Sequence, residues 1–168
     1  GGTRAVLLAL GPVLAELAPH GRRTKTPVDA SLLDVGTGLG DIPWKAREFA
    51  RRRGVRLRTL GLDGAPTLVV AARRRVSDAV CGDALRLPFA DRSVDVVVCS
   101  QLLHHFEEAD AVRLLAELDR VARKRVIVSD LRRSWLGAIA FWLASVALGF
   151  HRITRHDGTL SVLRGFTD

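Results

Sequence analysis

An acid followed by three glycines at alternate positions is the stretch of this chain best suited to do chemistry. Asp34 precedes Gly36, Gly38 and Gly40. A carboxylate at that point can accept hydrogen bonds from a ligand, and the glycines allow a ligand to lie against the backbone, where side chains would block it. The alternative interpretation is a tight turn that binds no ligand.

The residues on either side of the glycines predict the elements that position them. The apolar run at 32–35 is typical of a buried parallel strand, and a helical pattern begins at Asp41 and continues to Arg53. A strand, a glycine turn and a helix in that order form the first half of a nucleotide-binding βαβ unit. The dinucleotide fingerprint G-x-G-x-x-G/A would place its third glycine at position 41, so the spacing argues against a NAD-type cofactor.

A second acid, Asp63, ends the next predicted strand at 55–62, which alternates arginine with apolar residues. It lies 23 residues after Gly40. In a βαβ nucleotide site an acid at this point accepts hydrogen bonds from both ribose hydroxyls. Asp63 could also be the N-cap of the following helix, which has Pro66 in its first turn, and the two roles are compatible.

The motifs at 82–106 are the most specific in the chain. They are G-D-A at 82–84, L-P-F at 87–89 and S-V-D-V-V at 93–97, in the fourth predicted strand. Together with D-x-G-x-G-x-G at 34–40, they resemble the class I S-adenosylmethionine (SAM)-dependent methyltransferases, and within them the small-molecule branch of the quinone-biosynthesis type. That resemblance implies a Rossmann-like fold, SAM as cofactor and S-adenosylhomocysteine as product.

The resemblance also assigns roles to individual residues. It implies that Asp34 helps to hold the ammonium group of SAM, that Asp63 binds the ribose and that Asp83 meets the adenine amine. Asp95 lies inside the fourth strand, where we expect a structural role. No metal is expected. The expected cofactor-binding residues are Asp34, Gly36, Thr37, Gly38, Gly40, Asp63, Gly64, Asp83, Ala84, Ser100 and Gln101.

Three histidines are candidates for the base that methylation of a hydroxyl would need, because the acceptor must be aligned and must lose its proton. Histidine suits this task because its unperturbed pKa lies near neutrality. The candidates are, in order, His104, His156 and His105. His104 and His105 follow the fourth strand, and His156 adjoins Asp157 in a lid-like segment. The adjacent pair could instead brace the loop.

Strands that alternate with helices predict a single doubly wound α/β domain with a mostly parallel sheet. We expect an N-terminal helix and loop at 1–30, a cofactor-binding core at 31–130, and an apolar helix with a lid-like segment at 131–168. The family closes its sheet with two further strands, so we expect the C-terminal strands to be missing or incomplete.

Two further elements of the core are an amphipathic helix at 107–123 and a buried, parallel fifth strand at 125–130. The apolar stretch at 3–18 resembles a secretory signal, but Pro12 and Glu16 favour a helix on the sheet edge or over the cofactor mouth. The expected apolar stripe of the helix at 107–123 is Ala111, Leu114, Leu115, Leu118 and Val121.

Residues 134–150 carry no charge, and these 17 residues are fewer than a helix needs to cross a bilayer. We expect this segment to line an apolar substrate site or a homodimer contact, with peripheral membrane contact as a third option and no integral span. Two cysteines indicate no disulfide framework, so a reduced cytoplasmic location is expected.

The net charge of +8 permits an acidic partner without identifying one. The arginines fall near the ends of predicted helices, where they favour the helix dipole, and are not gathered on one face with aromatic residues. We therefore expect no nucleic-acid partner. The expected function is methyl transfer from SAM to a small apolar or aromatic acceptor such as a phenol or quinol. The alternatives are a catalytically idle SAM-binding scaffold and an RNA methyltransferase.

Overall fold

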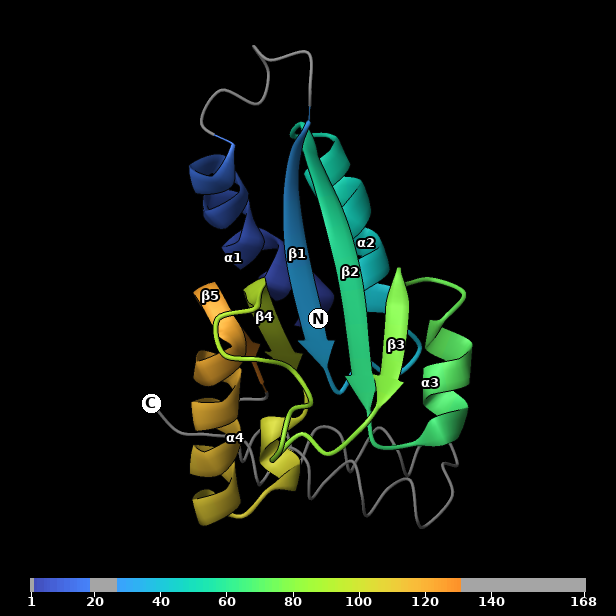
Figure 1. Ribbon diagram of the computed structural model, residues 1–168, viewed down its shortest axis with the longest axis vertical. Helices are drawn as coiled ribbons and strands as arrows, with labels where there is room; N and C mark the ends of the chain where they lie inside the picture. Colours follow the sequence, from blue (N-terminus) through green and yellow to red (C-terminus); the bar gives the residue numbers. More distant parts are fainter. Residues whose placement is uncertain (1, 19–26, 131–168) are drawn as a thin grey trace, which may run out of the picture.

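The described residues form a sheet of five strands with helices packed against it (Figure 1). The computed structural model describes residues 2–18 and 27–130 of the 168-residue chain. The predicted apolar helix at 134–150, the lid-like segment after it and His156 lie outside the described residues. The strands are β1 (Val28–Val35), β2 (Val55–Asp63), β3 (Asp78–Cys81), β4 (Val94–Ser100) and β5 (Ala122–Ser129). The helices are α1 (Gly2–Leu17), α2 (Asp41–Arg51), α3 (Pro66–Ala72), the 3-10 turn η1 (Leu103–His105) and α4 (Glu108–Val121).

The strand order is β3-β2-β1-β4-β5, and every neighbouring pair is parallel. The direction of winding reverses between β1 and β4. In open α/β sheets, ligands bind in the crevice at the carboxyl ends of the two strands where this reversal occurs. The residues that follow β1 and β4 are therefore candidates for binding a ligand.

Two apolar clusters cover the two faces of the sheet. Successive residues of a strand point to opposite faces. Accordingly, Leu32 belongs to the cluster that β1 forms with α1 and α2, and Leu33 belongs to the cluster formed with α4. Helices thus lie on both faces of a parallel sheet, which confirms the predicted doubly wound α/β fold.

The predicted N-terminal helix is present as α1, which packs against α2, β4 and β5. Its buried residues recur at helical spacing, so they face the sheet together: Val6, Leu10, Val13 and Leu14. None of the helices in residues 2–18 and 27–130 has both the length and the apolar character that a membrane span requires.

Two predicted burial patterns are wrong. Leu115, which we assigned to the buried stripe of α4, is 40% exposed, although the other four members of the stripe are buried. β5 was expected to be buried, yet only Ala122 and Ile127 in it are buried. The reason is its position, because β5 is the last strand on its side of the described sheet.

Asp95 has the structural role that its place in β4 predicted. Its Oδ2 accepts hydrogen bonds from the backbone N–H and the hydroxyl of Ser31, both at 2.9 Å, and its Oδ1 accepts one from Arg123 at 2.8 Å. Burial alone would raise the pKa of Asp95, but the hydrogen bonds from Ser31 and Arg123 outweigh burial and lower it. The carboxylate therefore ties β1, β4 and β5 together away from the crevice.

Candidate functional site

The loop between β1 and α2 requires glycine at three positions, because Gly36, Gly38 and Gly40 have φ angles of 76°, 54° and 75°. A Cβ added at Gly36 would lie 3.0 Å from the side chain of Leu102, so this glycine also permits close packing. A Cβ added at Gly38 would meet no atom of residues 2–18 or 27–130 within 4 Å. Gly38 therefore borders open space in which a ligand can lie against the backbone.

Asp34 is buried at the carboxyl end of β1, and one of its oxygens is not satisfied. Its Oδ2 accepts a hydrogen bond from the hydroxyl of Thr37 at 3.0 Å, whereas no described residue bonds to its Oδ1. Burial raises the pKa of Asp34 to about 7, against the opposing effect of the Thr37 hydrogen bond, and the nearby charge of Asp63 adds to the rise. An ammonium group would supply both the missing hydrogen bond and a compensating charge.

The side chain of Thr37 packs closely against Gly61 of β2. A Cβ added at Gly61 would lie 2.8 Å from the methyl group of Thr37 and 3.0 Å from its hydroxyl oxygen. Thr37 itself is buried. Gly61 thus leaves the space in which the Thr37 hydroxyl reaches Asp34.

Asp63 ends β2 and connects it to the glycine loop. Its Oδ2 accepts a hydrogen bond from the backbone N–H of Gly38 at 2.9 Å, and its Oδ1 accepts one from the N–H of Ala65 at 3.0 Å. The alternative interpretation of Asp63 as the N-cap of α3 is wrong, because the N-cap residue is Ala65, followed by Pro66. The carboxylate instead lies beside the loop, where each oxygen can accept one more hydrogen bond.

Asp83 follows β3 and is exposed; its Oδ1 accepts a hydrogen bond from the N–H of Leu85 at 2.9 Å. The segments after β2 and β3 lie together, because a Cβ added at Gly64 would be 3.9 Å from the carbonyl oxygen of Gly82. Ala84 is half-buried next to Asp83. The residues next to Asp63 and Asp83, the second and third predicted acids, therefore lie at the same edge of the sheet.

Ser100 and Gln101 lie where β4 ends. Ser100 is buried with no hydrogen bond to its hydroxyl oxygen from the described residues, and Gln101 is exposed with a φ of 58°. A Cβ added at Gly2 would lie 2.8 Å from the Ser100 Oγ. The first turn of α1 therefore lies against the crevice, one of the two placements expected for this helix.

His104 is buried in η1 and forms an imidazole–carboxylate pair with Asp130, which follows β5. The His104 Nδ1 and the Asp130 Oδ1 are 2.6 Å apart, and the backbone N–H of His104 donates to the Asp130 Oδ2 at 3.2 Å. His105 is exposed, and its ring centroid is 4.1 Å from that of His104. Asp130 therefore orients the ring of His104.

Sequence reasoning did not identify Asp130 as the partner of His104. It paired a different histidine, His156, with Asp157, and both lie outside the described residues. The signal was present, because His104 and Asp130 each follow one of two parallel strands. The carboxyl ends of neighbouring parallel strands meet at one edge of a sheet.

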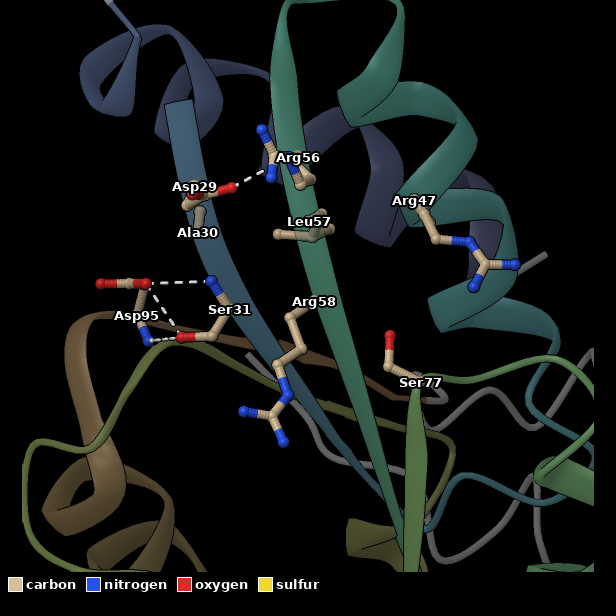
Figure 2. A pocket seen from close by; sticks show the side chains of 9 residues that line it. All are labelled: Asp29, Ala30, Ser31, Arg47, Arg56, Leu57, Arg58, Ser77 and Asp95. Carbon is tan, nitrogen blue, oxygen red and sulfur yellow. Dashed lines mark hydrogen bonds and ion pairs between the residues drawn. The ribbon is translucent and has the colours of Figure 1, made fainter. Parts of the chain in front are cut away.

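A cavity of about 580 Å³ lies away from all these residues, over the amino-terminal halves of β1 and β2 (Figure 2). Five of the nine residues that line it are charged, and two of them, Asp29 and Arg56, form an ion pair at 3.1 Å. None of the residues predicted for the cofactor or for catalysis lines it. We therefore place the candidate site at the carboxyl ends of β1, β2, β3 and β4, and not in this cavity.

Comparison with known proteins finds a family model described as a methyltransferase domain, which matches residues 33–129. Demethylmenaquinone methyltransferase of Thermotoga maritima is 32% identical over 104 residues, covering 60% of this chain and 43% of that protein. Probable tRNA methyltransferase 9B of Homo sapiens is 34% identical over 91 residues, covering 54% of this chain and 18% of that protein. Among solved structures, a SAM dependent methyltransferase from Archaeoglobus fulgidus gives a TM-score of 0.56 at 18% identity, covering 85% of this chain and 60% of that one.

The structural likeness concerns the fold alone at that level of identity. The chain spans less than half the length of either relative. The matched segment nevertheless begins in β1 and ends with β5, so it contains every described residue predicted for the cofactor site and both described histidines.

Proposed function

This chain belongs to the methyltransferase-domain family, and from that membership we propose that it transfers a methyl group from SAM to a small apolar or aromatic hydroxyl compound. A phenol or a quinol is the acceptor class that we propose. The observation that carries the proposal is the buried carboxylate of Asp34, whose Oδ1 no described residue bonds, close to the open space at Gly38.

The three acids at the carboxyl ends of the first three strands suit the three parts of SAM. Asp34 offers a buried oxygen to the ammonium group, and a charge-assisted hydrogen bond there would offset the cost of burying the carboxylate. Asp63 can accept hydrogen bonds from the ribose hydroxyls while it keeps its bond to Gly38. Asp83 is exposed, so it can accept a hydrogen bond from the adenine amine.

Bound SAM supplies a methyl group that is already activated by the sulfonium. The protein must therefore align the acceptor and, for a hydroxyl, take up its proton. His104 is the base in this proposal. Its Nδ1 faces Asp130 at 2.6 Å, so a proton held at Nδ1 leaves Nε2 as the ring nitrogen able to accept the proton of the acceptor.

The acceptor class rests on the likeness to a demethylmenaquinone methyltransferase. One observation favours a second candidate, methylation of RNA: a probable tRNA methyltransferase 9B is also a relative, and the net charge is +8. We prefer the small-molecule acceptor because the arginine triplets at 51–53 and 73–75 lie at or just after the carboxyl ends of α2 and α3, where they favour the helix dipole. His156 and His105 follow His104 as candidate bases.

Two measurements test the proposal. Calorimetry with SAM and with S-adenosylhomocysteine tests binding, and transfer of a labelled methyl group to phenols, quinols and bulk tRNA tests the acceptor. Binding of both ligands with transfer to a phenol or quinol supports the proposal. Transfer to tRNA alone would establish the second candidate, and binding without transfer to any acceptor would indicate an idle scaffold. A chain that binds neither ligand would refute SAM as the cofactor.

A further inference from the structure

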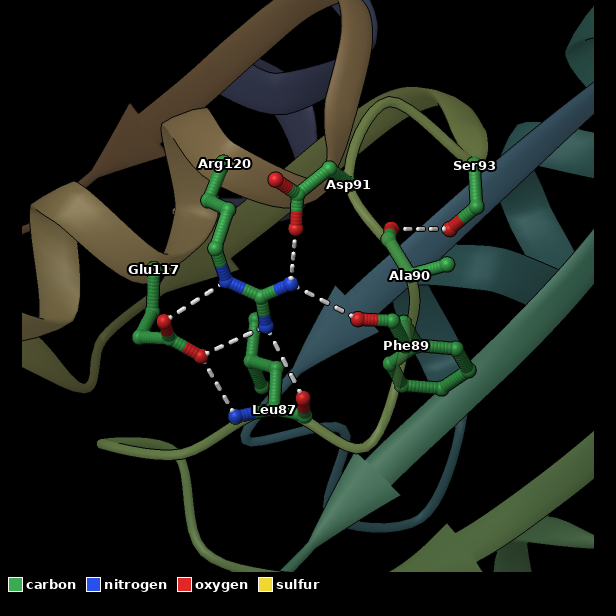
Figure 3. Close-up of polar contacts among 7 residues, drawn as sticks. All are labelled: Leu87, Phe89, Ala90, Asp91, Ser93, Glu117 and Arg120. Carbon is green, nitrogen blue, oxygen red and sulfur yellow. Dashed lines mark hydrogen bonds and ion pairs between the residues drawn. The ribbon is translucent and has the colours of Figure 1, made fainter.

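The guanidinium of Arg120 in α4 holds the loop that joins β3 to β4 (Figure 3). Its Nη1 donates to the carbonyl oxygen of Phe89 at 2.9 Å, and its Nη2 donates to that of Leu87 at 3.0 Å. Both contacts cross about thirty residues of sequence, so they are tertiary contacts between the helix and the loop. An arginine is suited to them because its planar fork presents several donors in a fixed arrangement.

Carboxylates complete the same cluster. Glu117 accepts from the Arg120 Nε at 2.8 Å and from Nη2 at 2.9 Å, while its Oε2 also accepts from the backbone N–H of Leu87 at 2.7 Å. Asp91 accepts from Nη1 at 2.7 Å. These contacts engage every N–H group of the guanidinium, which has five. Both the N–H and the carbonyl group of Leu87 are therefore held by one ion pair on α4.

The held loop segment lies against the residue that precedes Asp83. Pro88 stands between the two carbonyl groups that Arg120 binds. A Cβ added at Gly82 would lie 3.6 Å from the Pro88 Cδ and 3.2 Å from the side chain of Leu62. Gly82 also donates its N–H to the carbonyl oxygen of Asp63 at 3.1 Å. The path from Arg120 thus leads through Pro88 to Gly82, which is bonded to Asp63 and adjacent to Asp83.

We propose that Arg120 is a positioning residue for the adenine end of the cofactor site: it fixes the loop at 87–89 so that Gly82 and Asp83 keep the geometry that binds the adenine. This inference rests on the proposed function, since it needs SAM to be bound at Asp83. Arg120 contacts neither the acceptor nor the reacting methyl group in this scheme. Its loss therefore weakens SAM binding and leaves turnover at saturating SAM unchanged.

The test compares Arg120→Lys with a matched control, Arg113→Lys. Arg113 lies on the same helix and forms an exposed ion pair with Asp110 at 3.1 Å, whereas the hydrogen bonds that hold Leu87, Phe89 and Asp91 come from Arg120 and Glu117. We expect Arg120→Lys to weaken SAM binding roughly five- to fiftyfold in calorimetry, and Arg113→Lys to leave it unchanged. The KM for SAM should rise by the same factor while kcat stays at the wild-type value.

A double-mutant cycle with Asp83→Ala separates positioning from a general loss of stability. If Arg120 acts through Asp83, the double variant binds SAM no more weakly than Asp83→Ala alone. Fully additive losses, or an Arg120→Lys variant that binds like Arg113→Lys, would overturn the inference. Should Arg120→Lys fail to fold, Glu117→Gln weakens the same cluster and enters the same cycle.

The proposed function and this inference can fail separately. If the wild-type protein does not bind SAM, both are overturned. If the wild-type protein binds SAM and Asp83→Ala weakens binding, but the Arg120 and Asp83 effects are independent, only the role of Arg120 is overturned.

Discussion

The imidazole of His104 and the carboxylate of Asp130 are joined by a 2.6 Å contact between Nδ1 and Oδ1, and both side chains are more than nine-tenths buried. The same carboxylate accepts the backbone N–H of His104. The Asp130 carboxylate therefore interacts with both the ring and the main chain of His104 and fixes the position of each. Asp130 therefore restricts the orientation of the one described histidine that we propose as the base.

Replacing Asp130 with asparagine should lower turnover roughly 10²–10⁴-fold and leave SAM affinity unchanged. An asparagine cannot stabilise the charged imidazole, and its amide can donate to Nδ1 and so favour the tautomer that has no lone pair at Nε2. His104→Gln should cause a loss of similar size. The measurements are steady-state turnover with an identified acceptor and ¹⁵N NMR of the imidazole tautomer.

The matched control for that prediction is Asp110→Asn, which removes an exposed acid from α4 and its ion pair with Arg113. It should change neither turnover nor the NMR signals of His104. Normal turnover in both Asp130→Asn and His104→Gln would show that the reaction needs no base from this pair.

SAM affinity should rise with pH below about pH 7 because of Asp34. Burial raises the pKa of this carboxyl to about 7 in the free protein, so at lower pH it carries a proton that must leave before it can pair with an ammonium group. The expected change is at most about tenfold per pH unit. Calorimetry between pH 5 and pH 7 measures it, because the α-amino group of a ligand titrates only near pH 8.

Asp34→Asn serves as the control for this pH dependence. The asparagine cannot ionise, so SAM should bind more weakly and with an affinity that no longer varies between pH 5 and pH 7. If the variant keeps the wild-type slope, another group is responsible for the dependence.

The stability of the ligand-free fold should show the opposite trend with pH. The pKa of Asp34 is higher in the folded protein, about 7, than its ordinary value of 3.8, so the folded state binds the proton more tightly. The contribution of Asp34 to stability is therefore present below its ordinary pKa and is lost as the pH rises to about 7. Compared with the wild type, Asp34→Asn should gain stability on going from pH 4 to pH 8, by roughly 1–4 kcal/mol.

Urea unfolding at both pH values, with and without SAM, measures this effect. Saturating SAM should reduce the difference between wild type and variant at pH 8, since an ammonium group compensates the buried charge. A difference between wild type and variant that is independent of pH would mean that Asp34 titrates normally in the fold.

Gly38→Val should abolish SAM binding, because its side chain would occupy the open space that borders the loop. The substitution also forces a β-branched residue to a φ of 54°, which costs stability by itself. Gly54→Val is the matched control, since Gly54 has a φ of 76° in the turn between α2 and β2, at the opposite end of the sheet. It should lose about 1–2 kcal/mol of stability and still bind SAM. Unimpaired SAM binding by a folded Gly38→Val protein would place the ligand elsewhere.

The succession of strands and helices along the chain could be predicted, because each element depends on a local sequence pattern. The apolar run in β1, the glycines with positive φ and the 3.6-residue period of α4 each act over a few residues. The long-range contacts of the site could not be predicted in this way. Asp63 was predicted as a ribose ligand, with a helix N-cap as the alternative, but nothing local indicated that its carboxylate accepts the N–H of Gly38, 25 residues earlier in the chain.

The partners of Arg120 and His104 illustrate the same limit. Arg120 is one of several arginines at a helix end, and only the fold shows that it reaches two carbonyl groups of a distant loop. Asp130 was treated as the end of a strand. The strand order, which places β5 beside β4, makes it the partner of His104.

The fit of Thr37 over Gly61 has a consequence for how this protein can vary. A methyl group at position 61 would collide with Thr37, and that collision would pull the hydroxyl away from Asp34. Alanine at position 61 therefore requires a change at residue 37. Thr37→Ser would remove the closest contact, that of the methyl group at 2.8 Å, but would leave the hydroxyl oxygen 3.0 Å from the added Cβ, so the loop would also have to shift. Positions 37 and 61 are therefore expected to vary together. A larger residue at position 61 of β2 needs a compensating substitution at position 37.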